Sequence, residues 1–208
     1  MPLTRRGSNV SSAGSEASLD AFAALVQGTT EQRWVAARTL ATFQGGVDAL
    51  GRALASEQDA RVREAIFTSL ARVATPESAE AVLPYLRSDD ATLRTAALDA
   101  LKAMPGAVQP RLAELLADVD PDVRLLVCDI VMAVPTRASA ELLCRLLERE
   151  SEVNVCAAAV GVLAEIGGPD ALPALHRCAA RFAREPFLGF AVKAAANRIG
   201  THAKLARD

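Results

Sequence analysis

The sequence has few aromatic residues and lacks long apolar runs. Aromatic side chains make up 4% of the 208 residues, while alanine supplies 43 of them. The core must therefore be built from small side chains, which suits closely packed helices better than sheets. No apolar run reaches the roughly 18 residues that a transmembrane helix needs. Two arginines near the N-terminus have no apolar stretch behind them, so a secretory signal is not expected.

Motifs for catalysis and phosphate binding are lacking as well. The two histidines, His176 and His202, have no neighbouring glutamate at the spacing of a metal site, and no glycine-rich phosphate loop occurs. The acidic residues fall at helix-capping or solvated positions, so catalytic carboxylates are not indicated. The sequence therefore predicts no catalytic residue and no bound cofactor.

The cysteines form no Cys-x-x-Cys pair, so a zinc or iron–sulfur site has no local support. The nearest approach to a metal motif is His176-x-Cys178. We interpret the cysteines as reduced, small packing residues of a cytoplasmic protein and expect no metal. Because all of them fall in the second half of the chain, their proximity in space stays open. The four are Cys128, Cys144, Cys156 and Cys178.

Charge is nearly balanced over the whole chain but uneven along it. The net charge of −2 gives no general attraction to nucleic acid or to an anionic membrane. Residues 176–208 carry 7 basic and 2 acidic side chains, with Arg177, Arg181 and Arg184 close together on one expected helix. This basic end leaves nucleic-acid binding open, but no aromatic residues interleave with the basic ones as base stacking requires. A polar terminal repeat that keeps the end of a stack soluble is the simpler interpretation.

The chain repeats itself at a period of about 30 residues, which is typical of a solenoid. Apolar residues recur two or three, seven and ten positions after each of six anchor residues, which is one face of an α-helix. A shorter apolar run precedes each anchor helix, so each repeat is expected to be two antiparallel helices, a first (A) and a second (B) that carries the anchor. The anchors are Arg33, Arg63, Arg94, Arg124, Cys156 and Gly189.

Helix ends are marked at the same positions in each repeat. The residue four before each anchor can cap the B helix and oppose its dipole. Gly167 and Gly200 follow the last apolar residue of their helices, where a left-handed C-cap favours glycine. The expected N-terminal caps are Thr29, Asp59, Asp90, Asp120, Glu152 and Glu185.

The runs Asp59/Val62-Arg63, Asp90/Leu93-Arg94 and Asp120/Val123-Arg124 resemble the HEAT-like repeats of the phycobilisome-lyase type. The resemblance covers about residues 19–200 and implies an all-α fold, a right-handed α-solenoid (superhelix) of about six helix pairs. Residues 1–18, which are rich in serine and glycine, lie outside the resemblance and are expected to form a disordered tail. Residues 201–208 are expected to form a polar C-terminal tail.

The resemblance also implies a ladder of ion pairs between neighbouring repeats. Its rungs would be formed by Asp59, Arg63, Asp90, Arg94, Asp120 and Arg124. The anchors Cys156 and Gly189 depart from this pattern, so stacking of the last two repeats is expected to rest on apolar contact alone.

The B-helix positions one, five and eight past each anchor lie opposite the buried face. In HEAT-type solenoids this stripe resembles the concave surface that binds partners. Large apolar groups there, beside charged ones, are typical of interface hot spots, although aromatic groups at the ends can instead cap the stack. The candidate protein-binding residues are Trp34, Arg38, Asp99, Lys102, Leu125, Asp129, Met132 and Phe190.

These observations favour a non-catalytic scaffold or adaptor that binds another protein or a peptide segment. Nothing points to a membrane, and nucleic acid is disfavoured. The high arginine and alanine content is typical of GC-rich bacterial genomes. The resemblance to HEAT-like proteins implies an adaptor of a bacterial regulatory or signalling system. One enzyme class stays open through the resemblance alone, a bilin lyase-like or chromophore-handling subunit, which would need a tetrapyrrole-sized cleft and a partner chain.

Overall fold

A computed structural model describes the backbone of residues 9–205 and the side chains of residues 18–202. Within these residues the chain is an all-α solenoid of paired helices without a strand, as the repeat predicts. The chain divides into two compact units, residues 1–107 (unit 1) and 108–208 (unit 2).

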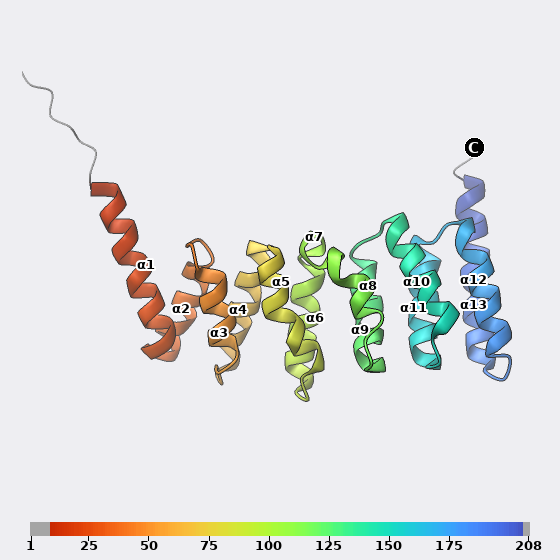
Figure 1. Cartoon of the computed structure of the whole chain (residues 1–208), viewed down its shortest axis with the longest axis horizontal. Coiled ribbons are helices and arrows are strands. Elements are labelled where there is room, and N and C mark those ends of the chain that lie inside the picture. Colours follow the sequence, from red (N-terminus) through yellow and green to blue (C-terminus); the bar gives the residue numbers. More distant parts are fainter. Residues whose placement is uncertain (1–8, 206–208) are drawn as a thin grey trace, which may run out of the picture. The chain divides into compact units, whose positions relative to one another are not determined.

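Unit 1 holds three helix pairs, each with an A helix followed by a B helix (Figure 1). The B helices α2, α4 and α6 pack in sequence, because each buries its apolar face against its neighbours. In chain order the elements are α1 (Asn9–Gln27), α2 (Thr30–Leu40), α3 (Gly46–Leu54), α4 (Ala60–Val73), α5 (Pro76–Val82), the 3₁₀ helix η1 (Leu83–Arg87) and α6 (Ala91–Lys102).

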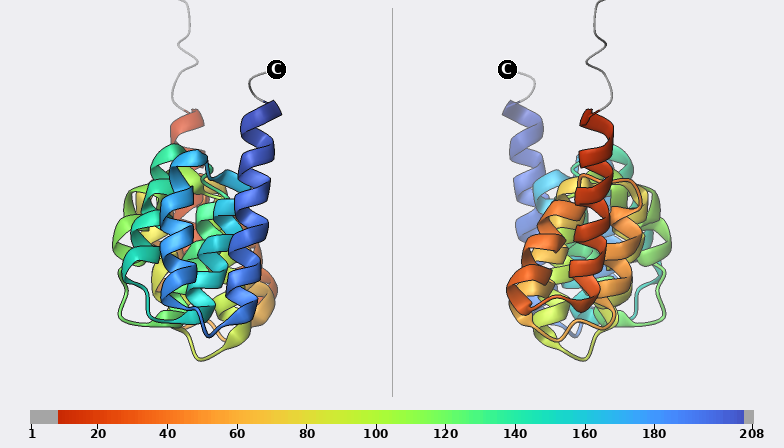
Figure 2. Two further views of the ribbon diagram at one scale, coloured as in Figure 1. Left: turned by 90° about the vertical axis from the view of Figure 1, so that its right-hand side faces the viewer. Right: turned by 90° about the vertical axis from the view of Figure 1, so that its left-hand side faces the viewer.

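Unit 2 repeats this arrangement with B helices α9, α11 and α13. Its last pair, α12 and α13, is antiparallel and side by side (Figure 2, left). The elements that follow α6 in chain order are α7 (Pro105–Val108), η2 (Gln109–Arg111), α8 (Leu112–Leu115), α9 (Pro121–Met132), α10 (Arg137–Arg149), α11 (Val153–Ile166), η3 (Pro169–Ala171), α12 (Leu172–Arg181) and α13 (Pro186–Leu205).

The B helices begin directly after the predicted capping residues, although the Glu152 side chain makes no capping hydrogen bond to α11. Thr29 forms a capping box with Gln32, in which the Thr29 hydroxyl accepts from the Gln32 backbone N–H and the Gln32 side chain accepts from the Thr29 N–H at 2.8 Å. The side chains of Asp59, Asp90 and Asp120 each accept a backbone N–H of the following helix. A carboxylate at this position satisfies a free donor and opposes the helix dipole.

The predicted glycine C-caps are wrong in their conformation. Gly167 does end α11, but its backbone is extended, with φ −77° and ψ 146°. A Cβ there would lie 2.4 Å from the Leu163 carbonyl oxygen, so glycine is needed for close approach and not for a left-handed turn. Gly200 lies inside α13, which continues to Leu205. The left-handed C-cap is found instead at Ala74, which ends α4 with φ 54°.

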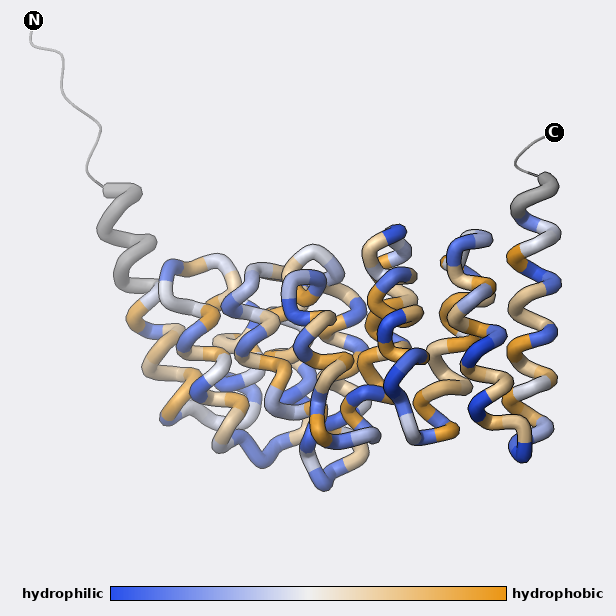
Figure 3. The backbone as a smooth tube through the Cα atoms, turned by 45° about the vertical axis from the view of Figure 1, so that its right-hand side comes forward, coloured by the Kyte–Doolittle hydropathy of each residue, from blue (hydrophilic) through white to orange (hydrophobic). Residues whose placement is uncertain are grey.

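The predicted apolar face is the buried face. The residues three past the anchors are buried in all six repeats, and those seven past are buried in five, while Ala196 is half-buried. Figure 3 shows the resulting alternation of hydrophobic and hydrophilic positions along the helices. Val35, two past its anchor, is 49% exposed. It lies on the flank of α2 that an earlier repeat would cover, and none precedes α1 and α2 in the described residues.

The expected limits of the repeat region fall within helices. The boundary at 18/19 lies inside α1, and the boundary at 200/201 lies inside α13. Residues 1–8 and 206–208 of the two expected tails lie outside the described residues. No described helix is both long and apolar enough to cross a membrane.

Candidate protein-interaction surface

Trp34 lies on α2 beneath two arginine side chains. The guanidinium of Arg38, one turn later on the same helix, is 4.6 Å from the centre of the indole ring, and that of Arg61 on α4 is 5.8 Å from it. Each contact of this kind contributes about 0.5–1 kcal/mol at an exposed site. Arg61 also pairs with Glu31, with 3.6 Å between Arg61 Nη2 and Glu31 Oε2. The half-buried indole is thus framed by charge on the outer face of the B helices.

Two grooves open beside these residues in unit 1. The first, of about 330 Å³, lies between α2 and α4 and includes Trp34, Arg38 and Arg61. The second, of about 600 Å³, lies between α4 and α6 and includes Asp99. Both are lined by the same three side chains of α4, so the two grooves adjoin along α4, and together we call them the unit 1 groove. The shared residues are Glu64, Thr68 and Arg72.

The floor and rim of the unit 1 groove differ in chemistry. Small residues of α6, such as Ala96 and Ala100, line the floor together with the buried Phe67 of α4. Arg72 is fixed at the rim because its Nη2 donates to the Arg38 carbonyl oxygen at 2.8 Å. An apolar floor with fixed charges at the rim can hold an extended peptide by its side chains and its backbone.

The eight predicted binding residues divide between the two units. Trp34, Arg38 and Asp99 line the unit 1 groove, and Lys102 is half-buried in the last turn of α6. In unit 2, Leu125, Asp129 and Met132 share one face of α9, and Phe190 is 75% exposed on α13. The α9 residues are half-buried rather than freely exposed. Glu64 and Thr68 of the groove lie on the predicted stripe of α4, whereas Arg61, Phe67 and Arg72 lie outside it.

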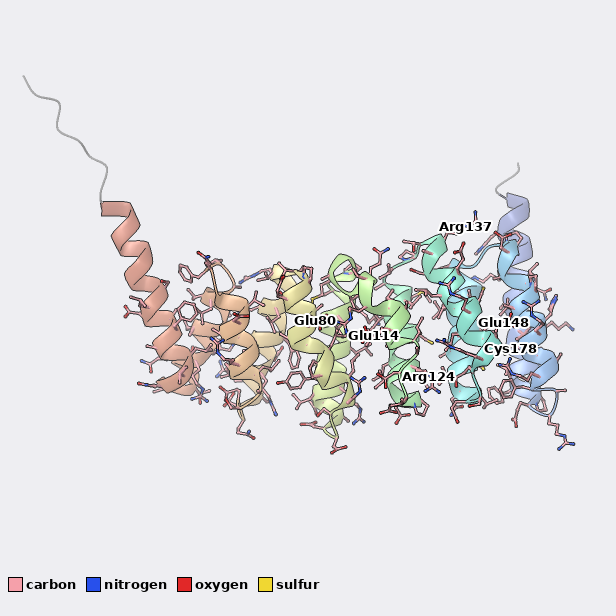
Figure 4. All side chains as sticks on the ribbon, in the orientation of Figure 1. Glu80, Glu114, Arg124, Arg137, Glu148 and Cys178 are labelled. Atoms are coloured by element: carbon pink, nitrogen blue, oxygen red, sulfur yellow. The ribbon has the colours of Figure 1, made fainter. Side chains whose placement is uncertain are left out.

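Arginine–glutamate pairs join neighbouring repeats, and Figure 4 labels Arg124, the arginine of one of them. Arg124 of α9 binds Glu150 through two contacts of 2.7 and 2.8 Å, and Arg33 of α2 binds Glu57 through contacts of 2.7 and 3.0 Å. Arg124 Nη1 also donates to the Asp118 carbonyl at 2.8 Å. Each arginine therefore joins the loop before its own helix to the loop before the next B helix.

The Glu150 side chain is 2% exposed, and its charge is stabilised by its partners. Burial raises the pKa of Glu150, but the Arg124 guanidinium and the backbone N–H groups of Glu152 and Ser151 outweigh it and leave the pKa below its usual value. The same pair raises the pKa of Arg124. The carboxylate is therefore ionised and serves a structural role.

Sequence reasoning singled out different acidic residues for this ladder. Asp59, Asp90 and Asp120 use their side chains as helix caps, while the arginines Arg33 and Arg124 bind glutamates two residues before the next cap. The pKa of the Asp90 carboxyl is lowered mainly by the hydrogen bond from the Thr92 backbone N–H, and the charge of Arg63 makes a smaller contribution. Arg94 donates to the Ser88 and Asp89 carbonyls at 2.6 and 3.1 Å.

A signal for the missed residues exists in the sequence. In four repeats, the residue six positions before the anchor accepts a hydrogen bond through its side chain from the backbone N–H of the capping residue. This acceptor shapes the loop in each case, although its residue type varies. The four acceptors are Glu57, Ser88, Asp118 and Glu150.

The expectation that the last repeats stack by apolar contact alone is wrong. Arg177 binds Glu148 at 2.5 Å, and Arg198 of α13 binds Glu165 of α11 at 2.5 Å. Arg181 donates to the carbonyls of Leu147, Glu148 and Glu150, at 2.6, 3.1 and 2.8 Å. Arginines on the following helix pair thus replace the anchor that Cys156 cannot provide.

The chain is similar to known proteins that are built from HEAT repeats. A family described as HEAT repeats matches residues 12–102 and 108–185. No curated protein matches the sequence. One similar chain comes from a solved structure on the structural basis of microtubule plus end tracking by XMAP215, CLIP-170 and EB1. Its TM-score is 0.60 at 16% identity, and the match covers 86% of this chain and 90% of that chain.

Two further solved structures match most of the chain. An archaeal HEAT-like repeats protein from Thermococcus onnurineus NA1 has a TM-score of 0.50 and 14% identity, covering 97% of this chain and 98% of that one. A chain of the complex of CpcE and CpcF of phycocyanin lyase from Nostoc sp. PCC7120 has a TM-score of 0.41 and 17% identity, covering 95% and 98%.

Proposed function

Because this chain belongs to the HEAT-repeat family, we propose that it is a non-catalytic scaffold that binds an extended segment of another protein in the unit 1 groove. The observation that carries the proposal is that the two grooves adjoin along α4, one of them beside Trp34. A preformed surface loses little conformational freedom on binding, so its contacts contribute directly to affinity.

The roles of the groove residues follow from their chemistry. Trp34 is the apolar anchor, since its indole offers a large contact area at the rim. Arg38, Arg61 and Arg72 favour carboxylates of the ligand, while Asp99 favours a basic group near α6. We further propose that Leu125, Asp129, Met132 and Phe190 supply binding surface in unit 2.

The protein contains one tryptophan, so its fluorescence reports on the groove directly. Peptides selected from a display library on the wild-type protein are titrated while Trp34 emission is followed. We expect saturable changes in emission for the selected peptides. Arg38→Ala is expected to weaken their binding about tenfold, because it removes a charge and uncovers one face of the indole.

Arg52→Ala is the matched control, since Arg52 is an exposed arginine of α3 that does not line the unit 1 groove. It should bind with wild-type affinity, and circular dichroism should show equal helicity for all three proteins. The proposal that the groove is the binding site would be contradicted if the Arg38 and Arg52 variants bound the peptides equally well. It would also be contradicted if the selected peptides left Trp34 emission unchanged.

The remaining alternatives have separate signatures. Nucleic-acid binding at the C-terminal end would appear as salt-sensitive affinity for oligonucleotides. Arg177, Arg181 and Arg198 already have partners within unit 2, which reduces the charge available for it. A lyase-like role would appear as visible absorbance of bound pigment. The reduced cysteines and arginine-rich composition support a cytoplasmic bacterial adaptor in a regulatory or signalling system.

A further inference from the structure

Large apolar side chains that are exposed to solvent gather in the first and last described helix pairs. All but Val119 belong to α1, α2 or α13. Figure 2 faces α13 in its left view and α1 in its right view. Terminal repeats of a solenoid normally carry a polar outer face, so these two pairs depart from that pattern. The exposed apolar residues are Leu19, Val26, Val35, Val119, Phe187 and Phe190.

One flank of each B helix faces the preceding helix pair. The residue six past the anchor lies on this flank, and it is only 1–6% exposed in every B helix that follows another within its unit. In α2 the matching residue is Thr39, which is half-buried, and Val35, one turn earlier, is 49% exposed. The preceding flank of α2 is therefore open. The buried residues at this position are Ser69, Ala100, Val162 and Ala195.

The other flank of each B helix faces the following pair. The residue four past the anchor lies there, and it is 0–3% exposed in every B helix that another follows within its unit. In α13 the matching residue is Lys193, which is exposed between two small residues of the same flank, Gly189 and Ala196. The following flank of α13 is therefore open and carries one long basic side chain. The buried residues at this position are Ala37, Phe67, Cys128 and Val160.

These two open flanks are the two halves of one type of interface. Within each unit, the following flank of one B helix packs against the preceding flank of the next, as in the pairs α2 and α4, and α11 and α13. In the described residues, α2 has no B helix before it and α13 has none after it. The α13 helix of one copy thus offers the half-interface that α2 of another copy lacks.

The open flank of α2 borders a pocket of about 440 Å³ between α1 and α2, which we call the α1–α2 pocket. Alanines of both helices and Val35 line it, together with the carboxylates of Asp20 and Glu31. Asp20 is exposed and has no ion-pair or hydrogen-bond partner among the described residues. Glu31 is 65% exposed. An apolar lining with carboxylates suits a lysine side chain, which has an aliphatic stem and a charged tip.

Charge favours a contact between unlike ends of two copies. Two first helix pairs would bring Asp20 and Glu31 of one copy against the same carboxylates of the other. Two last pairs would bring Lys193 against Lys193. A first pair against a last pair brings opposite charges together, which strengthens the contact and fixes its register.

We propose that the open flank of α1 and α2 binds α13 of a second copy of this chain, with Lys193 of the second copy in the α1–α2 pocket. The aliphatic stem of Lys193 covers Val35, and its ammonium group pairs with Asp20 and Glu31. The small residues of α13 allow a close approach to α2. Because the two surfaces differ, each copy keeps one open flank, and association continues beyond two copies as the concentration rises.

The test is analytical ultracentrifugation of the full chain over a range of concentrations. The average mass is expected to rise beyond that of two copies and to fall when salt is added, because salt screens exposed charges. Val35→Lys places a lysine of the same copy in the pocket, and Lys193→Glu reverses the charge of the other half. Each variant should weaken association at least tenfold. Both positions are exposed, and circular dichroism should show unchanged helicity.

An equal mixture of the two variants tests the geometry. The Val35→Lys protein keeps an intact α13, and the Lys193→Glu protein keeps an intact α1–α2 pocket. The mixture therefore contains one wild-type contact, and we expect a one-to-one dimer that does not grow with concentration. Two control variants change exposed residues outside both flanks and should associate as the wild type does. The controls are Val119→Lys and Arg52→Glu.

Cross-linking of the wild-type protein gives a measurement that does not depend on folding of the variants. A carbodiimide joins an amine directly to a carboxylate, and the cross-linked dimer is separated and mapped by mass spectrometry. We expect peptides that join Lys193 to Asp20 or Glu31. A wild-type protein that stays monomeric or stops at two copies, a mixture of variants that stays monomeric, or a cross-linked dimer without Lys193 would overturn the proposal.

Discussion

At the scale of single residues, a carboxylate that is only 2% exposed is stable in the fold, because an arginine balances its charge and its oxygen atoms accept hydrogen bonds. Glu150 is bound by Arg124 and by two backbone N–H groups. We expect Glu150→Ala to lower the free energy of unfolding by about 3 kcal/mol, because Arg124 keeps its charge in a half-buried position without a partner. Urea denaturation measures this loss.

Glu141→Ala provides the comparison for that experiment. Glu141 also pairs with an arginine, Arg137, at 3.2 Å, but its side chain is 53% exposed. Pairs at the surface contribute little, so the change should stay within about 0.5 kcal/mol. Similar losses in the two variants would show that burial of the Arg124–Glu150 pair has no energetic importance.

The pH dependence of stability follows from the same carboxyl. The pKa of Glu150 is lower in the folded protein than its ordinary value, which is about 4.3 in an unfolded chain. Its contribution is therefore fully present above that value and is lost as the pH falls through the folded pKa. We expect the stability difference between wild type and Glu150→Gln to be constant near pH 7 and to shrink below about pH 4. A difference that does not change in acid would contradict the assignment.

At the scale of helices, Gly167 is required by the end of α11. A Cβ at this position would lie 2.4 Å from the Leu163 carbonyl oxygen, so Gly167→Ala must displace the turn toward η3. We expect a loss of about 1–2 kcal/mol in unfolding free energy. Gly168→Ala is the control, because a Cβ at Gly168 meets nothing within 4 Å. Equal stability of the two variants would refute the steric explanation.

The sequence predicts the B helices better than the loops between them. Apolar spacing determines which face of a B helix is buried, so Leu40, Leu70 and Leu101 could be placed in the core from periodicity alone. The loop acceptors vary among glutamate, serine and aspartate, and a polar loop residue alone does not reveal its partner.

The candidate surface was predictable only in part for the same reason. Counting offsets on one helix placed Trp34, Arg38 and Asp99 on the outer face. A groove, however, is formed by the flanks of two helices, and Arg61 and Arg72 reach it because their long side chains extend beyond their own helical stripe. Counting positions along a single helix does not identify such residues.

At the scale of the whole molecule, a stack of repeats is stabilised mainly by contacts between neighbours. In unit 2, α11 packs against both α9 and α13, whereas α12 and α13 form the last pair of the described chain. We expect amide hydrogens of α13 to exchange at least tenfold faster than those of α11. Hydrogen exchange with mass spectrometry measures this ratio, and uniform protection across unit 2 would show that it opens as one cooperative body.

The two halves of the unit 1 groove share α4 as a common wall. Neighbouring packed helices are about 8–10 Å apart, and an extended chain advances about 3.3 Å per residue. A bound segment that crosses from α2 to α6 would therefore present every third residue to a new B helix. Residues of the ligand that contact the protein should therefore recur at every third position of its sequence. An acidic side chain is expected over Arg38 and Arg61, and a basic one is expected, at a multiple of this spacing, beside Asp99.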